Sequence, residues 1–207
     1  AVSGGVDSTV LLDKLVKAGE HEIIVAHFDH GIRTDSARDA QFVKLLAKKH
    51  GLQFETRREE LGENTSEEQA RNRRYAFLRD VAARHNAIIA TAHHIDDVAE
   101  TIAINLTRGT GWRGLSVLDS DIIRPLISET KREILDYAAR NNIEWREDST
   151  NEGDIYLRNR LRRRFAAVNH NDVILQLAAL RARQVELKRH IDQEVRLLIS
   201  GESYSRY

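Results

Sequence analysis

Short apolar runs alternate with stretches of helical periodicity along most of the chain. The runs at 23–28 and 87–92 are almost continuously apolar, which is typical of strands buried on both faces of a sheet. Weaker runs at 52–56 and 122–124, together with the apolar segment 1–2, predict three more strands.

Between these runs, apolar residues recur every three to four positions, which predicts helices. The spacing of Thr65 and Glu68 fits a capping box at the start of one helix, and Gly19 and Gly51 end two others. We expect helices over residues 9–18, 35–50, 65–85, 93–108, 129–141 and 173–199.

Strands that alternate with helices at this spacing predict an α/β fold, a doubly wound and mostly parallel sheet of five strands with helices on both faces. Right-handed crossovers favour the order 3-2-1-4-5, with the strands numbered along the chain. Strand 4 then lies beside strand 1, where the winding reverses. The loops at residues 3–8 and 92–97 would therefore face each other across the crevice in which such sheets bind ligands.

The pattern changes after Trp145, where a polar loop at 147–153 leads into an arginine-rich segment and then a long helix. We predict a catalytic domain over residues 1–155 and a C-terminal helical arm over residues 156–207. The arm is too short to form a core alone, so we expect it to dock on the first domain.

The composition is that of an ordinary globular protein of 207 residues, with 41% hydrophobic and 31% charged residues. No apolar run approaches the roughly 20 residues of a membrane span, so we expect no membrane partner and a cytoplasmic location. The chain has no cysteine, which excludes disulfides and thiolate metal sites within it. It also has no methionine, which indicates a chain trimmed at its N-terminus.

Charge is distributed unevenly, although the formal net charge is zero. Residues 151–207 hold 11 Lys and Arg against 7 Asp and Glu. Five arginines and no acid fall within 155–165, and Arg158, Arg160 and Arg162 are the candidates for contacts with a polyanion. A solvated helix face is the alternative interpretation of this run.

The strongest candidate for chemistry is the loop that leads from the first predicted strand into the first helix. Its backbone N–H groups and the positive end of the helix dipole suit a phosphate. It lacks the lysine of an ordinary P-loop, and its acid, Asp7, suits a magnesium ion that bridges phosphates. A glycine turn in which Asp7 or Ser8 caps the helix is the alternative. The candidate phosphate-binding residues are Ser3, Gly4, Gly5, Val6, Asp7 and Ser8.

A second cluster begins where the run at 87–92 ends. His93, Asp97 and Glu100 are spaced to share one face of the following helix. Such a face suits a divalent metal or, once water is excluded, a cationic substrate. Acids that only complement the helix dipole are the alternative.

Two further groups of residues suggest contacts with a nucleotide or a nucleic acid. Arg71 and Arg74 lie one turn apart and could clamp phosphate oxygens, although ion pairs with neighbouring glutamates explain them equally well. The glycine-rich segment 109–115 carries Trp112 beside Arg113, which suits a stacking platform for a base. A buried aromatic that anchors the loop is the alternative.

These motifs resemble those of a known family. Ser-Gly-Gly-Val-Asp-Ser at 3–8 resembles the signature of the PP-loop, or N-type, ATP pyrophosphatases. Further motifs, in order along the chain to about residue 165, resemble those of the tRNA(Ile)-lysidine synthases within that superfamily. They are the segments 29–33, 70–75, 92–101, 109–115, 124–126, 147–151 and 158–162.

The resemblance implies a ligase that uses ATP and magnesium to attach free lysine to C2 of the wobble cytidine in an isoleucine tRNA with a CAU anticodon. An adenylated tRNA would be the intermediate, with pyrophosphate and then AMP released. It implies that residues 3–8 hold the pyrophosphate and that Asp7 holds the metal. The other implied catalytic residues are Arg71, His93, Asp97 and Glu100, and the tRNA contacts are Arg113, Arg158, Arg160 and Arg162.

Other functions remain open at this point. A PP-loop tRNA-modifying enzyme of the 2-thiocytidine type shares the loop but needs cysteines for sulfur transfer. An amidating PP-loop enzyme and a non-catalytic nucleotide-binding or tRNA-binding module are further alternatives. The chain is shorter than most lysidine synthases, which carry additional tRNA-binding domains. The sequence does not decide between a monomer and a homodimer.

Overall fold

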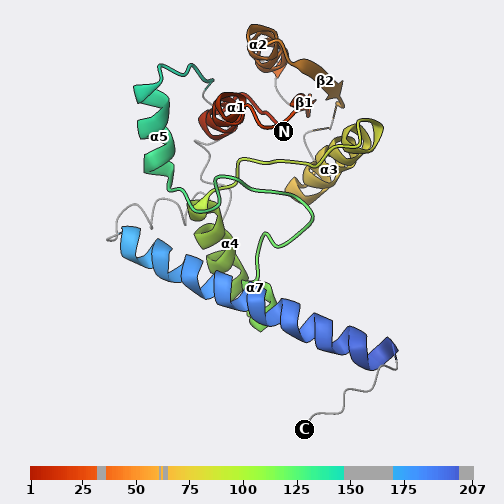
Figure 1. Ribbon diagram of the computed structural model, residues 1–207, viewed down its shortest axis with the longest axis vertical. Coiled ribbons are helices and arrows are strands. Elements are labelled where there is room, and N and C mark those ends of the chain that lie inside the picture. The colour runs from red at the N-terminus through yellow and green to blue at the C-terminus, as the bar shows by residue number, and fades with distance from the viewer. Residues whose placement is uncertain (32–35, 61, 63–64, 147–169, 201–207) are drawn as a thin grey trace. The chain divides into compact units, whose positions relative to one another are not determined.

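The computed structural model describes residues 1–31, 36–60, 62, 65–146 and 170–200. The chain divides into two compact units, whose elements are labelled in Figure 1. The predicted domain boundary near residue 155 lies outside the described residues. Within the described part of the chain, no helix is both long and apolar enough to cross a membrane. The first unit contains Ala1–His94 and Asp121–Ser149, and the second contains Ile95–Ser120 and Thr150–Tyr207.

The first unit contains a sheet of two parallel strands, β1 (Ile24–Asp29) and β2 (Gln53–Arg58), which pair over their full length. β1 is buried at almost every position, as its apolar run predicts, whereas β2 is mostly exposed. Helix α2 (Ser36–Lys49) connects the strands and contributes two fully buried side chains, Val43 and Ala47, to the core beneath them. The α/β class and the parallel pairing are therefore confirmed.

The sheet is smaller than the sequence predicts. Among the described residues, the segments 1–2, 87–92 and 122–124 are not strands. The run at 87–92 is also less buried than expected, because Ile88 is 73% exposed. Apolar content alone therefore predicts too many strands, because a strand also needs a continuous ladder of backbone hydrogen bonds.

Single backbone contacts nevertheless connect these segments to the sheet. Val2 donates its N–H to the carbonyl of Ala26 in β1 at 2.9 Å. The nitrogen of Ala1 donates to the carbonyl of Ala90 at 2.8 Å. Ala90 in turn forms an isolated parallel bridge with Ile123.

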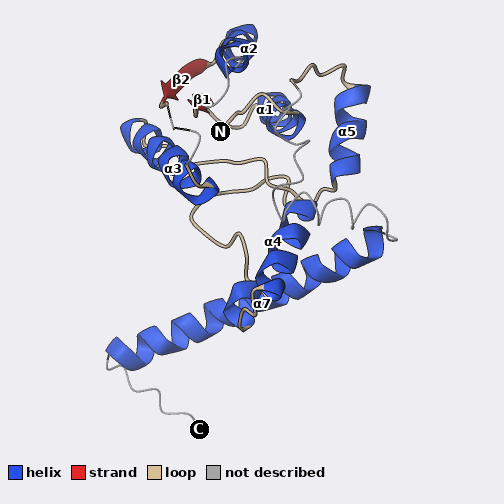
Figure 2. Cartoon of the chain, turned by 180° about the vertical axis from the view of Figure 1, so that it is seen from behind, coloured by secondary structure: helices blue, strands red, loops and turns tan. Residues whose placement is uncertain are grey.

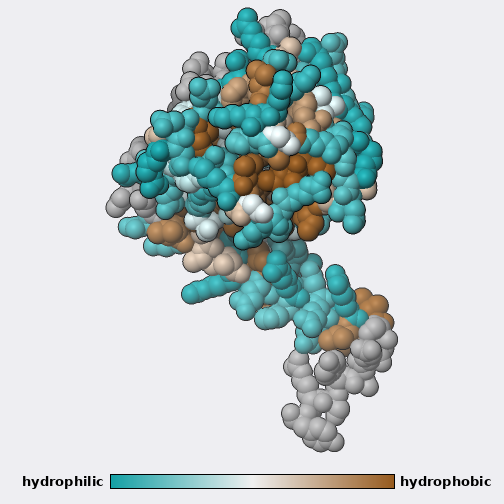
Figure 3. Space-filling model, turned by 45° about the horizontal axis from the view of Figure 1, so that its top comes forward, coloured by the Kyte–Doolittle hydropathy of each residue, from teal (hydrophilic) through white to brown (hydrophobic). Residues whose placement is uncertain are grey.

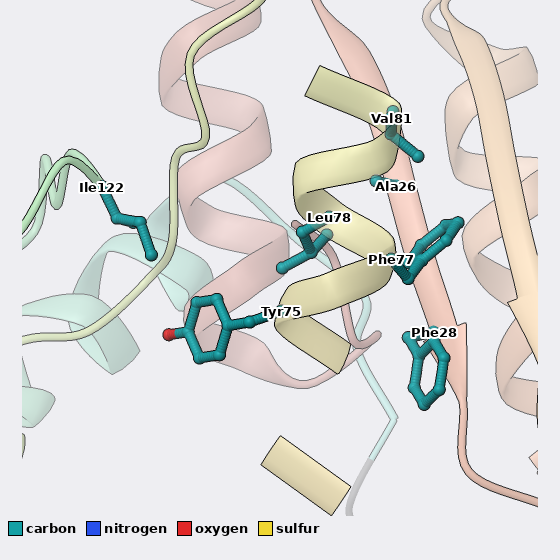
Figure 4. Packing of buried hydrophobic residues seen from close by; sticks show 7 residues of the cluster. All are labelled: Ala26, Phe28, Tyr75, Phe77, Leu78, Val81 and Ile122. Atoms are coloured by element: carbon teal, nitrogen blue, oxygen red, sulfur yellow. The ribbon is translucent and has the colours of Figure 1, made fainter. Parts of the chain in front are cut away.

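Helix α3 (Glu67–Arg84) covers β1 through an apolar cluster, which Figure 4 shows from close by. Ser66 caps the helix: its hydroxyl accepts the N–H of Gln69, and its own N–H donates to the Gln69 side chain. The capping box thus lies one residue later than the predicted pair of Thr65 and Glu68. The cluster consists of Ala26, Phe28, Tyr75, Phe77, Leu78, Val81 and Ile122.

A second core joins helix α1 (Val6–Ala18) to helix α5 (Lys131–Arg140). α1 ends where Gly19 adopts a left-handed conformation with φ of 66°, which glycine takes at little cost. Thr130 caps α5 in a capping box with Glu133. The buried side chains of this core are Val6, Val10, Leu11, Leu126, Ile134 and Ala138.

The second unit contains α4 (Ile95–Thr107), the short 3-10 helix η1 (Trp112–Leu115) and α7 (His170–Ser200). Figure 2 shows α7 as one continuous helix. α4 packs on it through an apolar cluster of Ile95, Ala99, Ile174, Leu177 and Ala178. The predicted helices are therefore confirmed, with ends that differ by a few residues.

Polar contacts also attach the 117–119 segment to α7. The Arg181 guanidinium donates to the carbonyl of Val117 at 2.8 Å, and Lys188 and Arg189 both contact the Asp119 carboxylate. Burial raises the pKa of Asp119, but these two cations outweigh it and hold that pKa below its usual value. Leu198 and Ile199, at the far end of α7, are apolar and exposed. Figure 3 shows where hydrophobic residues, in brown, reach the surface on one face of the molecule.

Candidate functional site

The 3–8 loop is closed on itself by the side chain of Ser8. The Ser8 hydroxyl accepts the N–H groups of Ser3 and Gly4 at 3.1 and 3.2 Å, and it donates to the carbonyl of Gly5 at 2.9 Å. Gly5 is the N-cap of α1 and contributes no side-chain acceptor. Ser8 therefore shapes the loop rather than capping the helix. The N–H groups of the first turn of α1 have no acceptor within the helix, which leaves them available to an anion.

Gly4 provides the turn that brings the loop into α1. Its φ is 100°, a conformation that residues with a side chain rarely adopt. A Cβ at this position would lie 3.5 Å from Phe42 and Val43, which is an ordinary contact. Backbone conformation, not lack of space, is thus what requires glycine here.

We expect Gly4→Ala to lower the free energy of unfolding by about 1–3 kcal/mol, because alanine is strained at this φ. Urea unfolding of the purified protein measures the loss. Gly5→Ala is the matched control, since Gly5 has φ of −72° and an added methyl would meet only the Ser3 hydroxyl at 3.7 Å. Its expected change is within about 0.5 kcal/mol. Equal losses in the two variants would contradict the assignment of strain to Gly4.

The carboxylate of Asp7, in the first turn of α1, is held by a lysine from a distant part of the chain. The Lys131 ammonium lies 2.5 Å from Asp7 Oδ1, and Lys131 is the first residue of α5. The buried ring of His94 also faces this carboxylate, with Nε2 3.9 Å from the same oxygen. The first unit thus brings an acid, a lysine and a histidine together at the loop.

His93, the histidine that the sequence favoured, makes a different contact. Its Nδ1 lies 2.9 Å from the Thr91 hydroxyl. Of two adjacent histidines at the end of this segment, His94 is therefore the one near Asp7. Helical spacing from Asp97 and Glu100 favoured His93, but both histidines precede the first turn of α4, where that spacing does not apply.

Arg71, on α3, belongs to a cluster of cations around one tyrosine. The Arg71 and Arg74 guanidinium carbons lie 4.8 and 5.4 Å from the centre of the Tyr75 ring. Burial lowers the pKa of Arg124, and the charge of Arg71 lowers it further, while Tyr75 opposes the shift. Burial and the charge of Arg74 likewise lower the pKa of His30. So many positive groups in one place favour binding of an anion such as phosphate.

Asp97 and Glu100 lie in α4 of the second unit. Glu100 is almost fully buried, with 4% of its surface exposed, and the Thr101 hydroxyl donates to the Asp97 carbonyl at 2.7 Å. A carboxylate at this depth is costly to desolvate unless a cation or donors compensate it. Asp7 belongs to the first unit, so the meeting of these acids at one crevice stays a prediction.

The glycine-rich segment of the second unit forms η1. The Asn105 amide donates to the Gly114 carbonyl at 2.7 Å and holds the turn against α4. Trp112 is 39% exposed, with the Arg113 guanidinium 5.1 Å from its ring centre and 3.5 Å from Asp192. Trp112 is thus not a buried anchor. The tRNA contact of Arg113 stays a prediction.

A family model described as the PP-loop domain matches residues 1–169. The chain belongs to the PP-loop domain family. The 3–8 loop, whose closure by Ser8 is described above, lies within the matched residues, and its binding of phosphate stays a prediction. The predicted tRNA contacts Arg158, Arg160 and Arg162 lie within the matched residues but outside those that the structure describes.

Curated relatives resemble the PP-loop chain closely over part of their own length. The tRNA(Ile)-lysidine synthase of Solibacter usitatus is 41% identical over 167 residues, which are 78% of this chain and 38% of that protein. A tRNA(Ile)-lysidine synthase of Thermus thermophilus is 43% identical over 171 residues, 78% of this chain and 33% of that protein. The chain therefore spans about a third to two fifths of the length of these relatives.

Among solved structures, the U34-tRNA thiolase NcsA from Methanococcus maripaludis, with its [4Fe-4S] cluster, has a similar fold. The TM-score is 0.71 at 18% sequence identity, over 89% of this chain and 71% of that one. At this identity the likeness shows a shared fold and nothing about the reaction.

Asp7 is the residue of the PP-loop that fits a magnesium ion. Among the described residues, no three His, Asp or Glu side chains are grouped as a complete metal site. Magnesium bound with a nucleotide needs no such group, because it keeps several waters and takes one or two carboxylates plus phosphate oxygens. A single accessible carboxylate beside a phosphate-binding loop has the chemistry of that arrangement.

Sequence analysis missed Lys131, His94 and Arg124 as members of the site. The position of Lys131 could have indicated an anion nearby, because a lysine directly after a capping threonine interacts unfavourably with the positive end of the helix dipole. His94 carried none beyond its place next to His93. Arg124 lay in a motif that resembled the family, but no role followed from the residue alone.

Proposed function

We propose that this chain carries the ATP-using domain of a tRNA(Ile)-lysidine synthase, which attaches lysine to C2 of the wobble cytidine in an isoleucine tRNA. The sequence identity of 41–43% to proteins of that name, over 78% of this chain, is the observation that carries the proposal. The closed 3–8 loop, with Asp7 at its end, supports the use of ATP. Because the substrates are ATP, free lysine and tRNA, the cytoplasm is the expected location.

The proposal includes a five-stranded sheet in the order 3-2-1-4-5. The backbone contacts from Val2 to Ala26, from Ala1 to Ala90 and from Ala90 to Ile123 support this order. In such a sheet the 3–8 loop follows the central strand at its carboxyl end, where open parallel sheets bind ligands.

The first proposed step transfers AMP to the tRNA. The C2 oxygen of the cytidine bonds to the α-phosphorus of ATP, and pyrophosphate leaves with the electron pair of the broken P–O bond. The N–H groups of the 3–8 loop bind the phosphates, and Arg71 contributes a further cation to them. Magnesium, held by Asp7, supplies charge neutralisation of the phosphates when it is bound.

The second proposed step attaches lysine. The lysine amine, as its free base, attacks C2 of the cytidine, and AMP leaves with the electron pair of the C–O bond. Asp97 and Glu100 orient the lysine through its charged groups, and His93 is the third residue proposed for this step. Arg113 and the arginines of the C-terminal segment hold the tRNA by its phosphates. These arginines are Arg158, Arg160 and Arg162.

Incorporation of radiolabelled lysine into tRNA tests the proposal. The full-length protein, with ATP and magnesium, should label an isoleucine tRNA that has a CAU anticodon, and AMP and pyrophosphate should form in equal amounts. The same tRNA with uridine at the wobble position is the matched control and should stay unlabelled. Absence of label under conditions in which ATP binds would refute the proposal.

A further inference from the structure

Lys131 occupies a position that helix electrostatics disfavours. It is the first residue of α5, directly after the N-cap Thr130, so its positive charge lies at the positive end of the helix dipole. Glu133 in the same turn is already engaged in the capping box with Thr130. A nearby anion offsets this unfavourable position, and the Lys131 ammonium lies 2.5 Å from Asp7 Oδ1.

The contact between Lys131 and Asp7 faces solvent and the phosphate-binding loop. The two side chains are 38% and 31% exposed, so a ligand can reach both charges. Asp7 is in the first turn of α1, and the N–H groups of that turn point toward the same region. An anion bound at the loop would therefore lie within reach of the Lys131 ammonium and would compete with Asp7 for it.

A second ion pair joins the same two parts of the chain. Lys14 of α1 contacts Glu129, two residues before α5, at 2.6 Å, with side chains 28% and 26% exposed. The apolar core between α1 and α5 lies beneath it. The Lys14 pair therefore connects the same two parts of the chain as Lys131 and Asp7, but outside the loop.

We propose that Lys131 is a catalytic residue that exchanges Asp7 for the pyrophosphate of ATP, an inference that rests on the proposed use of ATP. Without nucleotide, Lys131 and Asp7 neutralise each other. With nucleotide, the ammonium would bind the pyrophosphate portion, and the Asp7 carboxylate would be free to hold a magnesium ion, which would neutralise phosphate charge. As the bond between the α-phosphorus and the bridging oxygen breaks, its electron pair passes to the pyrophosphate, and Lys131 stabilises that charge.

Binding of inorganic pyrophosphate to the full-length protein tests the exchange without any turnover. By calorimetry with magnesium, Lys131→Met should weaken pyrophosphate binding on the order of tenfold and slow AMP formation about a hundredfold or more. Lys14→Met, the matched control, should leave both within twofold. Unchanged pyrophosphate binding in Lys131→Met, or an equal loss in Lys14→Met, would overturn the proposal. If Lys131→Met does not fold, Lys131→Gln is measured in the same way.

A double-mutant comparison without magnesium tests whether Asp7 and pyrophosphate compete for Lys131, or whether Lys131 only attracts pyrophosphate by its charge. Asp7→Asn removes the charge that Lys131 contacts, so it should strengthen metal-free pyrophosphate binding on the order of tenfold, and Lys131→Met in the Asp7→Asn background should remove that gain. A gain that persists in the double variant would contradict the exchange. These readouts are independent of lysine, so a protein that shows the exchange but never labels tRNA would refute only the lysidine proposal.

Discussion

Asp7→Ala should abolish release of pyrophosphate from ATP, with a loss of about a thousandfold or more in the rate of the first step. Asp7 is the accessible carboxylate at the 3–8 loop, and its contact with Lys131 at 2.5 Å fixes its place there. Removing it takes away the proposed metal ligand and leaves Lys131 without that carboxylate. Labelled pyrophosphate, released in the presence of the isoleucine tRNA, is the measurement.

The matched control for this variant is Asp13, which follows Asp7 along α1 by less than two turns. Asp13→Ala also removes an aspartate with a lysine partner, since Asp13 contacts Lys17 at 2.8 Å and accepts the Tyr137 hydroxyl. The Asp13→Ala substitution should affect stability only, because Asp13 contacts Tyr137 of α5 and not the 3–8 loop. An Asp7→Ala variant that keeps a tenth or more of the wild-type rate would contradict the role assigned to Asp7.

Glu100→Gln should raise the KM for lysine about tenfold to a hundredfold while adenylation of the tRNA continues. The substitution keeps the shape of a side chain that is only 4% exposed and removes its charge. A buried carboxylate attracts an ammonium strongly, and that attraction is what the variant loses. Lysine-dependent release of AMP from adenylated tRNA, set against pyrophosphate release, separates the two steps.

Asp119→Asn is the control for Glu100→Gln within the second unit. Asp119 is also a shielded acid, but it contacts Lys188 and Arg189 of α7. This variant should lower stability and leave the KM for lysine unchanged. An equal loss of ATP use and lysine use in Glu100→Gln would show that Glu100 supports the whole site rather than the lysine step.

Local patterns in the sequence predicted the helices well, because a helix is specified by contacts between residues three and four positions apart. The end of α1 at Gly19 and the caps of α3 and α5 are of this kind. The capping box of α3 was still displaced by one residue. Thr65 and Ser66 have equivalent capping chemistry, so residue type alone does not select Ser66, which is the cap in the structure.

The sheet was predicted less completely, because strands depend on contacts between segments that are far apart in the sequence. β1 and β2 pair as expected, but the segments at 87–92 and 122–124 meet only in the bridge between Ala90 and Ile123. A strand exists only when its backbone groups find partners on another segment, which apolar content does not reveal. The segment containing Ile88, 73% exposed, illustrates the difference.

The sequence by itself determined the family and located the 3–8 loop with its acid, since these depend on adjacent residues. Tertiary structure decided the neighbours of that acid. Lys131 lies 124 positions from Asp7 along the chain, and only the packing of α5 on α1 brings their charges together. The choice of His94 over His93 likewise depends on the direction in which the chain leaves Thr91. Charges act through space, so residues far apart in the sequence complete a site that short motifs only begin.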